Sequence, residues 1–189
     1  SVYQEVGWAT FDISSLPPGQ EPLSVEFNFY VYETNWPYWC VTHVSSNPLT
    51  AEPQELYEDI IEGYGSNGVN DYGTFDEASD FSVGSYSYQL IGSVLEDIAN
   101  TADTSNWFTI GVVDYDFIES GDYYIFLEGW AETNPPTLTL TYGEGQRLAE
   151  LVVVQMCRRS SIGTWKVRSI SMISLLIPCR STRSTRHSI

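Results

Sequence analysis

The first 146 residues contain no lysine and no arginine, and this constrains the fold and the partners of the chain more than any other feature. This stretch carries 24 of the 25 acidic residues and a formal charge of −24. All eight basic residues follow it, together with Glu150, and give a charge of +7. So abrupt a change indicates two stretches shaped by different constraints. We therefore predict an acidic domain at 1–146 and a basic, Ser/Arg-rich tail at 147–189.

The tail is rich in Ser and Arg and lacks the turn pattern that separates elements in the acidic stretch, and two interpretations of it stay open. It is either a natural basic segment that docks on polyanions or not a selected sequence, since a reading frame shifted near Gln146 would produce the same change. In both interpretations we expect the tail to be disordered or not a native domain, and to contribute nothing to the core.

The acidic charge excludes several classes of partner. Without Lys or Arg, residues 1–146 have nothing to neutralise phosphates, so we expect no nucleic-acid binding. No stretch of about 18 apolar residues is present, so we expect no membrane span. Cations, neutral sugars and basic protein patches are left as partners. An all-acid surface favours an extracellular or cell-surface location, and we expect the chain to be a processed product or a fragment of a larger precursor.

Apolar side chains recur at every second residue over several short stretches, which is the pattern of strands with one buried face. In the clearest case, Val25, Phe27, Phe29 and Val31 share one side. The pattern predicts strands at 8–13, 25–31, 39–44, 73–75, 86–91, 107–114, 123–130 and 137–142. These strands favour an all-β fold, an antiparallel jelly-roll-like β-sandwich.

Two short helices are predicted between these strands. One spans about 53–63, because Pro53 suits a first helical turn and Gly63 suits a helix end. The other begins near Ser93, which has the spacing of a capping box with Glu96.

The acidic domain resembles the secreted β-sandwich modules of large bacterial surface proteins, the broad group of DNRLRE-type and carbohydrate-binding-module-like domains. The segments that carry the resemblance are 9–19 (ATFDISSLPPG), 25–31 (VEFNFYV), 107–111 (WFTIG) and 135–142 (PPTLTLTY). It covers about residues 5–142. The resemblance implies a jelly-roll sandwich appended to hydrolases, adhesins or surface-sorted proteins, and it implies no catalytic residues.

Aromatic side chains gather around one predicted strand and the turn that follows it. Tyr30 and Tyr32 lie on the face opposite Phe29 and Val31, so an exposed aromatic strip is one interpretation. Such rings can stack on the apolar faces of sugars. The alternative is that helices or a neighbouring domain cover the strip. The candidate ligand-binding residues are Tyr30, Tyr32, Trp36, Tyr38, Trp39 and Trp130.

Carboxylates crowd one predicted loop between two strands. Asp114, Asp116, Glu119 and Asp122 have no Lys or Arg nearby in sequence to offset their repulsion, so a cation would relieve it. Three interpretations stay open: a calcium site, a glycosidase carboxylate pair, or a solvated acidic loop. A second cluster, at 71–80, allows the same three with a weaker case for calcium.

Nucleophilic catalysis has little support in the sequence. Cys40 and His43 are three residues apart, so on a strand they face opposite sides and cannot form a nucleophile–base pair. We expect Cys40 to pack as a small apolar group.

We therefore predict a non-catalytic extracellular module that binds a polysaccharide or contacts neighbouring surface-protein domains, with calcium as the stabilising ion and with self-association as a further form of contact. The alternative is a structural spacer, or a filament or surface-layer repeat, without a ligand of its own. A carboxylate-based glycoside hydrolase or lyase is the third hypothesis.

Overall fold

The computed structural model describes residues 6–35, 39–48, 50–65, 71–75, 82–114, 124–129, 131–143 and 148–158. The strands of this part are β1 (Val6–Asp12), β2 (Ser24–Asn35), β3 (Trp39–His43), β4 (Asp71–Phe75), β5 (Gly84–Gln89), β6 (Trp107–Asp114), β7 (Tyr124–Leu127), β8 (Thr137–Thr141) and β9 (Leu148–Arg158). The helices are α1 (Pro53–Gly65) and α2 (Val94–Thr104). Every strand and helix predicted from the sequence occurs here with somewhat shifted ends, and β9 is additional.

The strands form antiparallel pairs in the order β4-β3-β6-β1-β9-β8-β2-β5, and β7 pairs with β2 beside this path. They make two sheets, one from β4 to β1 and one from β8 to β5, which β9 joins. The two ends of the path also approach each other, because the amide of Ile91, just after β5, donates to the carbonyl of Tyr72 in β4 at 2.8 Å. The predominantly antiparallel β fold with two helices is as predicted.

The main core lies between the two sheets and is rich in aromatic rings. All four apolar residues predicted to share one face of β2 are buried there, which confirms the period-two interpretation. The Phe29 ring contacts Trp39 of β3 edge to face at 5.2 Å and stacks on Tyr88 of β5 at 5.7 Å. Such pairs stabilise the core beyond the area they bury.

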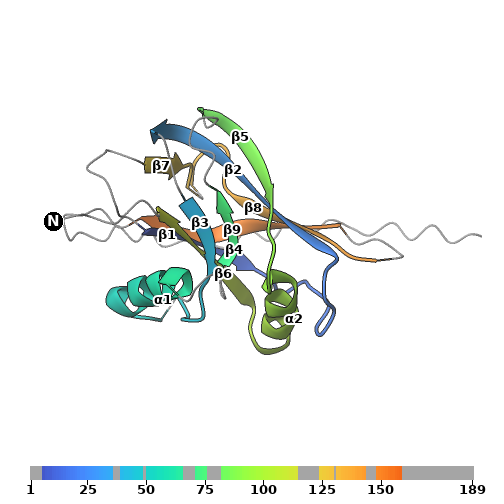
Figure 1. Cartoon of the computed structure of the whole chain (residues 1–189). Helices are drawn as coiled ribbons and strands as arrows, with labels where there is room; N and C mark the ends of the chain where they lie inside the picture. Colours follow the sequence, from blue (N-terminus) through green and yellow to red (C-terminus); the bar gives the residue numbers. More distant parts are fainter. Residues whose placement is uncertain are drawn as a thin grey trace, which may run out of the picture.

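The helix α1 lies against the outer face of the β4–β1 sheet (Figure 1), and a second apolar cluster packs between them. Leu56 and Ile60 of α1 pack there with Trp8 of β1 and Cys40 of β3, so Cys40 is a small apolar packing group as predicted. Because α1 covers this face, β1 buries residues on both sides, where alternation alone predicted only one buried side. This sheet is therefore the middle layer of three.

The prediction for the basic tail is wrong over residues 148–158. The first half of β9 pairs with β8, its second half pairs with β1, and Leu151 is 4% exposed in the main core. The register against β1 shifts between Thr10, opposite Gln155, and Phe11, opposite Val153. One extra β9 residue therefore lies at the point where the strand passes from one sheet to the other. Bulges of this kind are common in strands that switch sheets. The fold continues past the charge boundary near Gln146.

In the part of the chain that the structure describes, no helix is long and apolar enough to cross a membrane.

Candidate functional site

The predicted aromatic strip is only partly formed by the residues expected in it. Tyr32 is 44% exposed and Tyr30 is half-buried, both at the end of β2 farther from Ser24. Trp36, Tyr38 and Trp130 lie outside the described residues, so their part of the prediction stays a prediction.

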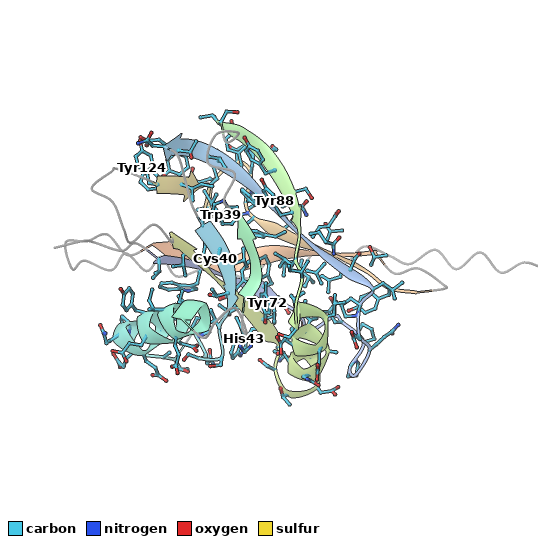
Figure 2. All side chains as sticks on the ribbon, viewed as in Figure 1. Trp39, Cys40, His43, Tyr72, Tyr88 and Tyr124 are labelled. Atoms are coloured by element: carbon cyan, nitrogen blue, oxygen red, sulfur yellow. The ribbon has the colours of Figure 1, made fainter. Side chains whose placement is uncertain are left out.

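Trp39 does not belong to this strip. It shares a face of β3 with Val41, and that face is turned towards the core between the sheets, where the indole is fully buried. Figure 2 shows Trp39 and Tyr88 between β5 and β3. Their rings meet edge to face, with the centroids 5.9 Å apart. Alternation groups the residues of a strand by face, but it does not say which face is buried.

A β-bulge re-aims the end of β2 towards solvent. Against β7, Val31 pairs with Leu127 and Glu33 pairs with Phe126, which leaves Tyr32 as the extra residue on β2. Strict alternation would turn Tyr32 outwards and Glu33 inwards. With the bulge, both are exposed on the outer face. Bulges next to functional sites often have this effect on a side chain.

The strand β7 contributes two further rings beside Tyr32. Tyr124 and Phe126 stack with their centroids 4.7 Å apart, and Phe126 lies 5.8 Å from the Tyr32 ring. The Tyr124 hydroxyl donates to Glu33 Oε1 at 3.0 Å, which fixes the carboxylate beside the rings. Tyr32, Tyr124 and Phe126 are called the outer aromatic cluster below. Figure 2 shows Tyr124 at the β7 side, away from the helices.

An open groove of about 330 Å³, with both polar and aromatic side chains in its lining, continues from Tyr30 across β2 and β5. Its lining includes Asn28, Tyr30, Ser85, Ser87 and Asn134. The Asn28 amide donates to the hydroxyls of Thr137 and Thr139 at 3.3 and 3.0 Å. Glu128 Oε2 accepts from both the backbone and the side-chain nitrogen of Asn134, at 2.7 and 2.9 Å. Hydroxyls and amides held in place next to exposed rings are a typical lining of ligand sites.

A second hollow, of about 470 Å³, lies between the end of β3, α2 and the start of β6. His43 and Trp107 are among its lining residues. The loop on one side is anchored to α1, because Asp59 accepts from the amides of Ser45 and Ser46 at 2.8 and 2.7 Å.

Cys40 does not lie beside His43 in this hollow. It faces Tyr72 of the main core at 5.9 Å between ring centroids, whereas Cys40 packs towards α1 in the other cluster. The prediction that Cys40 and His43 lie on opposite faces of the strand is confirmed.

A small polar network ties α2 to β4 next to this hollow. Asp97 Oδ2 accepts from the hydroxyls of Tyr72 at 2.9 Å and Ser93 at 2.7 Å. Burial raises the pKa of the Tyr72 phenol above its ordinary value of 10.0, and the charge of Asp97 raises it further. The predicted capping box does not form, because Ser93 makes no side-chain cap hydrogen bond and bonds Asp97 instead.

The predicted calcium ligands cannot be assessed from the described residues. Asp116, Glu119 and Asp122 lie outside them, and so does the side chain of Asp114. Within the described part of the chain, no group of three or more His, Cys, Asp or Glu side chains could hold a metal ion. The calcium site stays a prediction.

Comparison of the chain with protein-family models, with curated proteins and with solved structures finds no match.

Proposed function

We propose that this protein is a non-catalytic extracellular module that binds a glycan on the outer face of β2, β5 and β7. The observation that carries the proposal is the outer aromatic cluster, in which Tyr32 keeps 44% of its surface exposed beside Phe126 and Tyr124. An exposed ring on a bulge that packs against two partly buried rings, next to an open groove, is an arrangement suited to ligand contact.

The chemistry of this face fits a sugar chain. The Tyr32 ring and the partly exposed rings beside it offer apolar surface to the C–H faces of sugar units. Asn28, Ser85 and Ser87 supply amide and hydroxyl groups along the groove that begins at Tyr30. The face is therefore proposed to bind several sugar units along the line from Tyr32 into the groove.

The proposed class of module is the jelly-roll-like β-sandwich of secreted bacterial surface proteins. Two antiparallel sheets around an aromatic core support this class, together with the resemblance of segments 9–19 and 135–142. The location proposed with it is extracellular or at the cell surface. Calcium, at the acidic loop that begins with Asp114, is the proposed stabilising ion.

A second candidate function is that of a spacer or repeat in a surface assembly. Leu23, Val83 and Ile91 are large apolar side chains with 60–66% of their surface exposed, which favours contact with a neighbouring domain or a second copy. This candidate requires no ligand for the outer aromatic cluster.

Affinity electrophoresis in native gels that contain a soluble polysaccharide tests the proposal. The full chain is expected to be retarded, and Tyr32→Ala and Phe126→Ala are expected to abolish retardation, whereas Tyr32→Phe keeps the ring and retains it. Leu23→Ala, which removes an exposed apolar group at the other end of β2, is the matched control and is expected to change nothing. Trp36→Ala and Trp130→Ala are expected to weaken retardation if these rings extend the face.

Retardation that survives Tyr32→Ala, or no retardation on any polysaccharide of a broad panel, would contradict glycan binding at this face and favour the spacer.

A further inference from the structure

Two carboxylates are held in fixed positions on the proposed glycan-binding face. Glu33 is fixed by the Tyr124 hydroxyl, and Glu128 is fixed by two nitrogens of Asn134. Glu128 also lies next to the groove, because its amide donates to the Tyr30 carbonyl at 2.8 Å. The carboxylates therefore lie beside the outer aromatic cluster and beside the groove, and neutral groups orient both of them.

No basic side chain on these strands offsets the two negative charges. The sequence from Ser1 to Gln146, which includes β2, β5, β7 and β8, contains no Lys and no Arg, and the part of β9 that pairs with β8 contains only Glu150 as a charged residue. Negative charge with no counter-charge in the same surface attracts cations and repels acidic polymers. An acidic polysaccharide is therefore a poor partner for this face.

We propose that the glycan bound by this face carries protonated amines, as a polymer of deacetylated amino sugars does; this inference rests on the proposed function. An ammonium group between Glu33 and the rings of Tyr32 and Phe126 makes a charge-assisted hydrogen bond to the carboxylate and a favourable contact with a ring face. A neutral sugar satisfies the rings and the hydroxyls equally well, but it leaves both carboxylates without a partner of opposite charge. The fixed carboxylates therefore select the amine.

Binding of oligosaccharides of equal length by calorimetry tests the inference on the full chain. The probes are oligomers of glucosamine, N-acetylglucosamine, glucose and galacturonate at about pH 5.5, where the sugar amines are protonated. The glucosamine oligomer is expected to bind most tightly, and Glu33→Gln and Glu128→Gln are each expected to weaken it by about tenfold. The galacturonate oligomer is expected not to bind.

A matched control distinguishes binding at Glu33 and Glu128 from general attraction to the net negative charge of the protein. Glu21→Gln removes the same charge from the loop before β2, at the end of that strand away from Glu33, and is expected to leave the affinity unchanged within about twofold because salt screens distant charges. Thermal melting shows that each variant is folded. Equal loss in Glu21→Gln and Glu33→Gln would overturn the inference, because attraction to the whole acidic surface would then explain the binding.

The remaining outcomes distinguish the two proposals from each other. If the N-acetylglucosamine or glucose oligomer binds as tightly as the glucosamine oligomer and Tyr32→Ala abolishes this, glycan binding stands and selection by charge fails. If oligolysine binds as tightly as the glucosamine oligomer and is weakened equally by Glu33→Gln, the face recognises basic protein segments and the inference fails. If none of the four oligosaccharides binds, the inference fails, and retardation on the broad polysaccharide panel then decides whether glycan binding stands.

Discussion

Gly111 of β6 lies where the middle sheet packs closely against Ile60 of α1. It is opposite Trp8 in β1 and opposite Thr42 in β3. A methyl group added at Gly111 would lie 2.6 Å from Thr42 Oγ1 and 2.9 Å from the Cγ2 atom of Ile60 in α1. Both neighbours are fully buried, so neither can move aside into solvent.

Gly111→Ala is therefore expected to destabilise the protein strongly. Without a clash, alanine in a strand would stabilise by about 0.5–1 kcal/mol, because glycine loses more conformational freedom on folding. Overpacking of a filled core costs about 1–3 kcal/mol, and contacts as short as 2.6 Å put this site at the upper end. A net loss of about 2 kcal/mol lowers the melting temperature by roughly 4–8 °C for a chain of this size.

A double-mutant cycle in urea, followed by tryptophan fluorescence, tests the cause of this loss. Thr42→Ala removes the closest atom, which is also a buried hydroxyl with no hydrogen-bond partner among the described residues. We expect the double variant to be more stable than the sum of the single changes predicts, by about 1 kcal/mol. A loss below about 0.5 kcal/mol in Gly111→Ala, or strict additivity, would refute the close contact between β6, β3 and α1.

Four further predictions follow from the structure and the sequence. Tyr72→Phe removes a hydrogen bond to a carboxylate and is expected to lower the free energy of unfolding by about 1.5–3 kcal/mol in urea titrations; an unchanged midpoint would contradict the link between β4 and α2. Burial raises the pKa values of Tyr72 and Tyr142, so their contribution to stability is complete below the ordinary value of 10.0 and is lost as the pH rises above it. Tyr142→Phe should accordingly reduce the fall of the melting temperature with rising pH, measured from about pH 9, just below the ordinary tyrosine pKa, upwards. An unchanged slope of melting temperature against pH would count against a raised pKa of Tyr142. Removal of residues 147–189 is expected to abolish cooperative unfolding seen by circular dichroism, whereas removal of 159–189 retains β9 and the transition; equal melts would show that β9 is dispensable. Added calcium is expected to raise the melting temperature, and EDTA to reverse the rise; a melt that ignores both would argue against a calcium site.

Alternation predicted the elements well because burial in a sheet repeats every two residues, whatever the rest of the fold is. The strand from Trp107 to Asp114 was predicted at its observed ends, and all four apolar residues of 25–31 that share a face are buried. The same pattern could not tell that Trp39 points into the core, because the direction of a face depends on which layers cover it. The covering of β1 by α1 is also a tertiary property, which no local period contains.

The candidate site was predicted only in part for a related reason. Tyr30 and Tyr32 were found because they alternate with buried residues of β2. Glu33 was missed because a bulge changes the alternation at Tyr32, and Tyr124 and Phe126 were missed because β7 lies far away in sequence. A partner strand and its register come from pairing, not from the strand's own residues.

The strand β9 was not predicted from the sequence, because the basic charge of residues 147–189 concealed the apolar pattern within them. The segment Leu151-Val152-Val153-Val154 is apolar and contains three β-branched valines, which favours a strand. The surrounding arginines describe the solubility and the partners of a surface, and they do not determine whether the backbone joins a sheet.

The position of β9 sets the order of events when the chain is made. Ala9 is paired with Met156, so β1 waits for a partner strand that is synthesised after all the other described strands. Until then β1 and β8 each present an edge without its neighbour, and such edges invite pairing with other chains. Contacts this distant in sequence also slow the search for the native state. A nascent or truncated chain that stops short of β9 is therefore the form of this protein most prone to aggregate.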